Sequence, residues 1–231
     1  NDLQLLLHDS INVSDGEVNF CEWARVIIVH AGSDEALSGS SEDIRSQYFR
    51  VGCGAPAKTD DGALISSAII LSEFDPLGVF VHEFLHSLGA LDLYGGKGER
   101  ERFIGDWDVM ATGWRLGVRL TGGEFILGEH PSLPSSWTKI RVGWFRDSDI
   151  VMVGPGRHLI EILPLEERRE GIHVVKIPIT STVYYLVEVR EKRGFDSYLP
   201  DEGFLLYISN EEATTVFNGL LRLVDANPNT D

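Results

Sequence analysis

The sequence predicts an α+β fold on the strength of three observations. In the first half of the chain, two apolar runs at residues 24–30 and 63–71 are typical of buried strands. Between Asp75 and Gly89 lies a segment with the start and stop signals of a helix. After about residue 150, short β-branched or alternating runs recur. We therefore expect a twisted sheet backed by helices, followed by a β-rich portion.

The helix between Asp75 and Gly89 is the most clearly delimited element. Asp75 is a favourable N-cap, Pro76 suits the first helical position, and Gly89 stands where a left-handed residue ends a helix. Apolar side chains surround most of its circumference, so we expect it to be buried. These are Leu77, Phe80, Val81, Phe84, Leu85 and Leu88.

The remaining elements follow from shorter patterns. We expect short helices within residues 42–48 and 135–142, the second ended by Gly143. Strands are expected at residues 159–163, 173–177, 183–189, 204–208 and 220–224. We place a boundary between an α/β part, residues 1–148, and a β-rich part, residues 149–231. Two domains, or one domain with two parts, both fit this pattern.

Composition excludes several classes of protein. A chain of 231 residues, 43% of them hydrophobic, can bury a substantial core. Its net charge of −16 argues against nucleic-acid binding, which needs a basic surface. No apolar run approaches the roughly 20 residues of a membrane-spanning helix. Residues 3–7 are too short for a signal peptide, and we expect a piece of a longer precursor. Cys21 and Cys53 form a disulfide or remain two free thiols.

One motif indicates metal chemistry. His82-Glu83-Phe84-Leu85-His86 matches H-E-x-x-H. Four helical residues turn the chain by about 400°, so both imidazoles project from one face. Glu83 lies about 100° further around the helix, which suits a base acting on water rather than a metal ligand.

A third ligand is expected at Asp92. Catalytic zinc uses three protein ligands and keeps a fourth position open. Gly89 allows the chain to reverse after the helix, and Asp92 follows His86 by six residues. The complete pattern, H-E-x-x-H-x-x-G-x-x-D, is expected by chance in about one in ten thousand shuffled sequences of this composition. We therefore predict a zinc site made of His82, His86 and Asp92.

This pattern resembles the metzincin clan of metallopeptidases, and within it the immune inhibitor A family of secreted proteases. That family has Asp where most metzincins have a third His. The resemblance covers most of residues 24–208 and is strongest over 78–114. It is carried by His30-Ala31-Gly32, Gly78-Val79-Phe80, Asp92-Leu93-Tyr94, Trp107-Asp108-Val109-Met110, Gly143-Trp144, residues 184–190, Gly194-Phe195-Asp196 and Leu199-Pro200.

The resemblance implies a secreted zinc endopeptidase with a metzincin-like fold. Protein or peptide substrates would be hydrolysed by a zinc-activated water, with Glu83 as the general base. Met110 would be the residue of the Met-turn, which supports the metal site without binding the ion. The segment Ala111-Thr112-Gly113-Trp114 lacks the Tyr that some metzincins carry there. A weak calcium-like pattern is formed by Asp9, Asn12, Asp15 and Glu17.

Two other classes stay open. One is a zinc-binding but inactive surface or adhesion module, against which the intact Glu83 argues. The other is a β-rich binding domain, for instance for carbohydrate, within residues 150–231. Glu188 is expected either to line a cleft or to pair with Arg190, and His30 to form a hydrogen bond at a strand end. The remaining histidines, His8, His130, His158 and His173, are expected to be ordinary polar residues.

Overall fold

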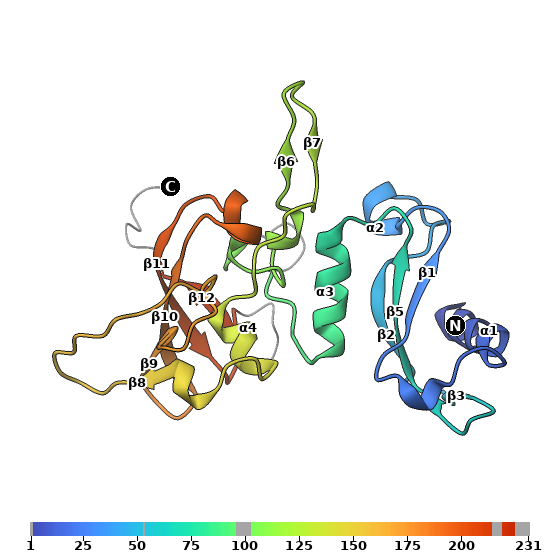
Figure 1. Cartoon of the computed structure of the whole chain (residues 1–231), viewed down its shortest axis with the longest axis horizontal. Helices are drawn as coiled ribbons and strands as arrows, with labels where there is room; N and C mark the ends of the chain where they lie inside the picture. The colour runs from blue at the N-terminus through green and yellow to red at the C-terminus, as the bar shows by residue number, and fades with distance from the viewer. Residues whose placement is uncertain (1, 53, 96–102, 214–218, 225–231) are drawn as a thin grey trace. The chain divides into compact units, whose positions relative to one another are not determined.

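The computed structural model describes residues 2–52, 54–95, 103–213 and 219–224. The chain forms two compact units, Asn1–Ser87 and Leu88–Asp231, and each is described separately (Figure 1). Both combine helices with small sheets, so the predicted α+β class is confirmed. The predicted boundary at residues 148–149 marks a change in secondary structure, and it lies inside the second unit.

The first unit is built on a three-stranded sheet in the order β1-β5-β2. Strand β1 (Ile27–His30) is parallel to β5 (Ser67–Ser72), and β2 (Gln47–Arg50) is antiparallel to it. The central strand β5 is buried from Ala68 to Ser72 because both of its faces are covered. Since side chains alternate between the faces of a strand, the apolar run supplies a core on each side.

Helix α1 (Asp2–Ser14) packs on one face of this sheet. Leu7 and Ile11, one turn apart, are 0% and 1% exposed and form a core with Phe20 and Ala68. The sequence patterns above do not predict this helix, because residues 3–7 stand out only as a short apolar run. The helical signal is Ile11, an apolar residue four positions after Leu7, which lies outside that short run.

Several expected elements of the first unit were wrong. Residues 42–48 form no helix; instead α2 (Glu35–Ser38) is capped by Asp34, and the chain then enters β2. The run at residues 63–71 is divided into β4 (Leu64–Ile65) and β5. Strand β4 pairs with β3 (Ala57–Lys58), and η1 (Phe20–Glu22) is a single 3₁₀ turn. The pairing of β2 with β5 and of β3 with β4 involves residues that are distant in sequence, so the local patterns did not predict it.

Helix α3 (Leu77–Ser87) contacts β2 and β5. Its end is as predicted, because Gly89 has φ +99°. Its burial was overestimated: Leu77 and Phe84 are 41% and 39% exposed. Asp75 does not cap the helix. Its Oδ2 accepts hydrogen bonds from Ser72 N and Ser46 Oγ at 2.7 and 2.5 Å, and burial raises its pKa.

The second unit contains a five-stranded sheet in the order β12-β11-β10-β9-β8. Its strands are β8 (Ile150–Met152), β9 (Val174–Pro178), β10 (Val183–Arg190), β11 (Gly203–Asn210) and β12 (Leu221–Leu223). The four runs predicted after residue 170 are confirmed. Residues 159–163 form no strand, and Leu159 is fully exposed. The short strand β8 was not predicted.

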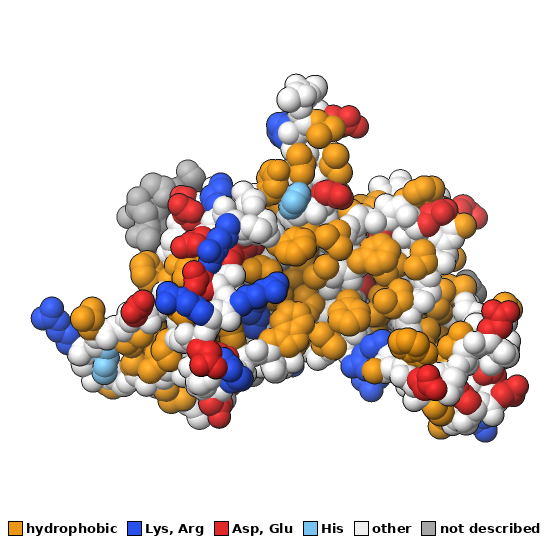
Figure 2. Space-filling model, viewed as in Figure 1, with side chains coloured by type: hydrophobic (Ala, Val, Ile, Leu, Met, Phe, Trp, Pro, Cys, Tyr) orange, Lys and Arg blue, Asp and Glu red, His pale blue; other side chains and the backbone are white. Residues whose placement is uncertain are grey.

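Helix α4 (Ser136–Arg141) confirms the helix predicted within residues 135–142. Ser135 is its N-cap, and the Ser135 side chain accepts a hydrogen bond from Thr138 N. Before it, the hairpin β6 (Val118–Arg119) and β7 (Phe125–Ile126) projects from the rest of the unit (Figure 1). Hydrophobic side chains are exposed on it, among them Leu120, Phe125 and Ile126 (Figure 2). Single 3₁₀ turns complete the unit: η2 (Gly105–Trp107), η3 (Gly113–Arg115), η4 (Asp147–Asp149) and η5 (Gly194–Tyr198).

Among the described residues, no helix has the length and hydropathy needed to cross a membrane. Cys21 is an exposed free thiol. Cys53, with which the sequence left open either a disulfide or two free thiols, lies outside the described residues, as do residues 96–102.

Candidate metal centre

Helix α3 presents two imidazoles on one face. His82 and His86 are one turn apart, and their Nε2 atoms lie 3.2 Å from each other. The two rings are nearly perpendicular, at 86°, with centroids 4.8 Å apart. His82 is buried and His86 is half-buried. This convergence of two ring nitrogens is what the four-residue spacing predicted.

Asp92 joins this pair. One ligand atom each from His82, His86 and Asp92 lie within 4.8 Å of one another, the only such group among the residues that the structure describes. The turn at Gly89 brings the chain back, and the Arg141 side chain donates to its carbonyl oxygen at 3.3 Å. The three predicted ligands are thus brought together within a segment of eleven residues.

The donor set fits a divalent transition metal. Two ligands of a tetrahedral zinc ion, each at about 2.05 Å, lie about 3.3 Å apart, close to the spacing of the two Nε2 atoms. Two imidazoles and one carboxylate match the ligand types of catalytic zinc and leave a fourth position. The same donors also accept other first-row metals, so the geometry alone does not select zinc.

Glu83 is held in a way that the sequence did not reveal. Its Oε2 accepts a hydrogen bond of 2.6 Å from the backbone N–H of Tyr48 in the edge strand β2. Glu83 is half-buried and does not belong to the three-ligand group. A fixed carboxylate next to a metal-ligand group can accept a proton from a correctly placed water. The contact joins residues 35 positions apart, which no local pattern records.

Met110 lies in a tight turn and is fully buried. Its carbonyl oxygen accepts a 2.8 Å hydrogen bond from the N–H of Leu93, the residue after Asp92. Asp108 shapes the turn, because its Oδ1 accepts from Met110 N at 2.7 Å. Asp108 Oδ2 accepts from Ser135 N and Thr138 Oγ1 at 2.9 and 2.6 Å. The turn is therefore tied both to the segment carrying Asp92 and to the start of α4.

A buried ionic network holds the second unit together. Arg190 is 0% exposed and donates to Asp196 Oδ2 at 2.9 and 2.7 Å and to Glu188 Oε1 at 3.2 Å. It also donates to Trp107 O and Leu133 O at 2.9 and 3.3 Å. Burial opposes its charge, but the two carboxylates outweigh this and raise its pKa above the ordinary value.

Of the two expected roles for Glu188, pairing with Arg190 is therefore confirmed. The motifs at residues 184–190 and 194–196 supply this network, which supports the loops at Trp107 and Leu133. The family resemblance included both motifs but implied no physical task for them. The sequence did contain a signal for this network. Glu188 and Arg190 are two positions apart in a strand, so their side chains lie on the same face, and Asp196 follows in the next turn.

The other predicted polar residues have ordinary partners. His8, His158 and His173 contact backbone carbonyl oxygens, at 3.1 Å for His8. His30 contacts Ala31 O at 3.0 Å, as expected at a strand end.

Asp9, Asp15 and Glu17 of the calcium-like set do not form a ligand group among the residues that the structure describes. Asp9 and Asn12 lie within helix α1, and Asp15 accepts a hydrogen bond from Asp60 N at 2.8 Å. The structure thus gives Asp15 a structural task. Calcium binding at this set stays a prediction.

Comparison of the chain with models of known protein families and with curated proteins gives no match.

Proposed function

We propose that this chain is a zinc-dependent endopeptidase of the secreted, metzincin-like type. The observation that supports this most strongly is the His82, His86 and Asp92 group with Glu83 beside it on the same helix. Ligands and base come from one short segment, as in the H-E-x-x-H peptidases. The substrates would be proteins or peptides, and the resemblance to the immune inhibitor A family supports an extracellular location.

A bound zinc ion would supply a Lewis acid that polarises the scissile carbonyl and lowers the pKa of a water molecule. Glu83 takes the proton of the attacking water and passes it to the leaving amine. The Tyr48 N–H donates a hydrogen bond to Glu83 Oε2. The same hydrogen bond restricts the orientation of the carboxylate, which lowers the entropic cost of reaching the geometry for proton transfer.

The residues around Met110 act as support. Leu93 N donates to Met110 O, and Asp108 holds the Met110 N–H. Movement of this turn would therefore be passed to the segment that carries Asp92. This support is consistent with a Met-turn role for Met110, in which the side chain binds no metal.

Cleavage of casein tests the proposal directly. Wild type should cleave it, lose activity with a chelator and regain activity with added zinc. Glu83→Gln should keep its zinc and its Tyr48 contact, yet lose about 10²–10⁴-fold in kcat because an amide cannot accept the proton. Glu42→Gln, at an exposed position in the same unit, is the matched control.

The outcomes separate the alternatives. If Glu83→Gln kept more than about a tenth of wild-type kcat, Glu83 would not be the base. Stoichiometric zinc without cleavage of casein or a peptide library would favour the inactive surface or adhesion module. Less than half an equivalent of zinc, after dialysis against zinc-containing buffer, would contradict the metal site itself.

A further inference from the structure

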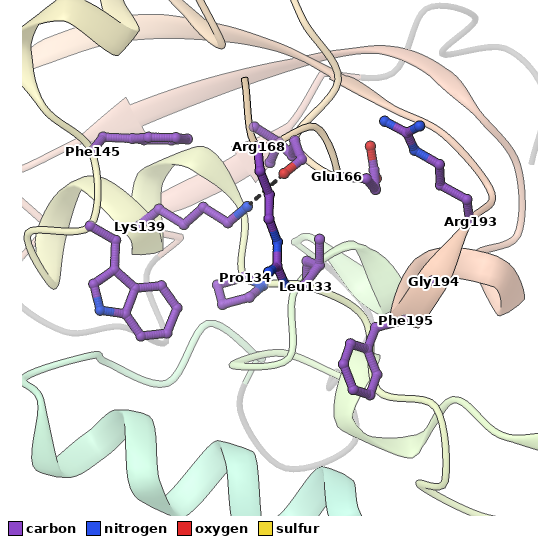
Figure 3. Close-up of a pocket in the computed structure, with 11 residues that line it drawn as sticks. Leu133, Pro134, Lys139, Phe145, Glu166, Arg168, Arg193, Gly194 and Phe195 are labelled. Carbon is purple, nitrogen blue, oxygen red and sulfur yellow. Dashed lines mark hydrogen bonds between the residues drawn. The ribbon is translucent and has the colours of Figure 1, made fainter. Parts of the chain in front are cut away.

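The second unit contains a pocket that the proposed function does not use. Its volume is about 690 Å³, within the range of small-molecule sites. The pocket lies between α4, the residues that follow it, the loop at residues 165–168 and the start of η5 (Figure 3). His82, Glu83, His86 and Asp92 are not among its lining residues.

Cationic side chains dominate the polar part of the lining. The lining includes three cationic residues, Lys139, Arg168 and Arg193, and one acidic residue, Glu166. Arg193 is neutralised by Glu167 and Glu191 at 3.2 and 3.1 Å. Arg168 is exposed and has no ion pair within the part of the chain that the structure describes. In a protein of net charge −16, this local excess of positive charge is unusual. Figure 2 shows Lys and Arg side chains on the visible face of this unit, with Asp and Glu side chains between them.

Lys139 is the most informative of these residues. It is 8% exposed, and its side chain extends from α4 into the pocket toward Arg168 (Figure 3). Its three N–H donors have one hydrogen-bond acceptor among the described residues, Leu165 O at 3.3 Å. Burying an ammonium group with so few partners costs free energy. Burial and the nearby Arg190 accordingly lower its pKa to about 8. An anionic ligand would satisfy the remaining donors.

Glu166 does not cancel this charge at neutral pH. Burial and its hydrogen bond with Asp196 raise its pKa to about 8. Its Oε1 also lies 3.4 Å from Arg190 Nε, so this carboxyl group pairs with Arg190 as well. The carboxylates of Glu188 and Asp196 are not among the pocket-lining residues, and both are paired with Arg190.

The rest of the wall is apolar and aromatic. Phe145 lies 5.7 Å from Lys139 Nζ, measured to its ring centroid, and Leu165 and Pro134 line the same pocket. Trp144 and Phe195 are 51% and 49% exposed, so their rings remain accessible at this surface. Cations beside aromatic surfaces are the complement of an acid with an apolar body.

We propose that this pocket binds a small carboxylate that carries an aromatic or bulky apolar group. The carboxylate contacts Lys139 and Arg168, and the apolar group packs among Phe145, Leu165 and Phe195. Either a free organic acid or the C-terminal residue of a peptide has this chemistry. The proposal does not depend on the metal centre.

Titration calorimetry with the full chain tests this, in the presence of a chelator that keeps carboxylates from binding a metal ion. The probes are 3-phenylpropionate and the peptide acid acetyl-Ala-Ala-Phe. Acetyl-Ala-Ala-Phe amide lacks the charge, and acetate lacks the apolar group. We expect the peptide amide and acetate to bind at least about tenfold more weakly than the acids, because each lacks one half of the interaction. The tighter of the two acids identifies the source of the ligand.

Two variants test the cations. Lys139→Met keeps the length of the side chain and Arg168→Gln changes an exposed residue; each should weaken the acids about tenfold or more. Arg157→Gln, exposed and outside the pocket, is the control. If Lys139 served only to balance the charge of the acids around Arg190, the pocket would hold no carboxylate. The Arg168→Gln variant would then bind the two acid probes as wild type does. Equal binding of acid and amide, acetate binding as tightly as the acids, no binding of either acid, or unchanged affinity in Arg168→Gln would each overturn the proposal.

Discussion

Asp108 gives the sharpest test of how the turn at Met110 and the segment that carries Asp92 are supported. Its carboxylate is 0% exposed and accepts three hydrogen bonds, from Met110 N, Ser135 N and Thr138 Oγ1. Asp108→Ala would leave all three donors without this acceptor in the interior. Each buried donor left unsatisfied costs about 1–3 kcal/mol, and part of the total is recovered because a buried charge is also removed. We expect a net loss of about 3–5 kcal/mol.

Asp108→Asn should cost less, about 1–2 kcal/mol, because its amide oxygen can still accept from Met110 N. The Thr138 hydroxyl can rotate to accept from the new NH₂ group. Only Ser135 N–H then faces a donor in place of an acceptor. The order wild type, Asn, Ala therefore follows from the number of donors left unsatisfied.

Hydrogen exchange measured by mass spectrometry over residues 108–138 reads this locally, and urea unfolding reads the whole chain. A loss of about 4 kcal/mol corresponds to about a thousandfold faster exchange where the amide opens with the unit. Asp147→Ala, at an exposed position of the same unit, is the control. A cost below about 1 kcal/mol for Asp108→Ala would refute the assignment of a structural role to these three bonds.

Three further predictions concern the metal centre and the buried acid. Asp92→Ala should weaken zinc binding by more than the roughly 10–100-fold typical of lost outer partners, and Asp92→His should retain more zinc; elemental analysis after dialysis measures both. Full zinc in Asp92→Ala would exclude Asp92 as a ligand. Gly89→Ala should cost about 1–2 kcal/mol in urea unfolding because φ is +99°. An added Cβ would meet no atom within 4 Å, so the backbone conformation is the source of this cost, and unchanged stability would contradict it. The raised Glu166 pKa favours the fold below about pH 4.5, and this contribution is lost as pH rises to about 8. Relative to wild type, Glu166→Gln should therefore gain stability from about pH 5 to 8 in urea unfolding; a constant difference would contradict the shift.

The local parts of the site could be predicted because they depend on short-range geometry. Four residues of helix place His82 and His86 on one face in any fold that keeps the helix. Gly89 was identifiable because a left-handed conformation suits glycine and few other residues. The strands of the second unit after residue 170 also followed from alternation, since each has one buried face.

Other features depended on partners far away in the sequence. Residues 42–48 carry a weak helical pattern, yet 47–50 pair with β5 and become a strand. Leu159 belongs to an apolar run, but no neighbouring strand among the described residues pairs with it and it stays exposed. Asp75 has the chemistry of an N-cap but satisfies Ser72 and Ser46 instead. At residues 42–48 and at Asp75, tertiary contacts overrode a local preference of small free energy, whereas the run at Leu159 lacked the partner that a strand needs.

By itself the sequence determined the spacing of the candidate ligand group, because His82, His86 and Asp92 lie within eleven residues joined by one helix and one turn. Only the tertiary structure decided what holds that group in place. The contact of Tyr48 with Glu83, that of Leu93 with Met110, and those of Asp108 with Ser135 and Thr138 join residues far apart in the chain. Such contacts depend on the packing of whole elements, whose free energy is shared among many residues and leaves no short pattern.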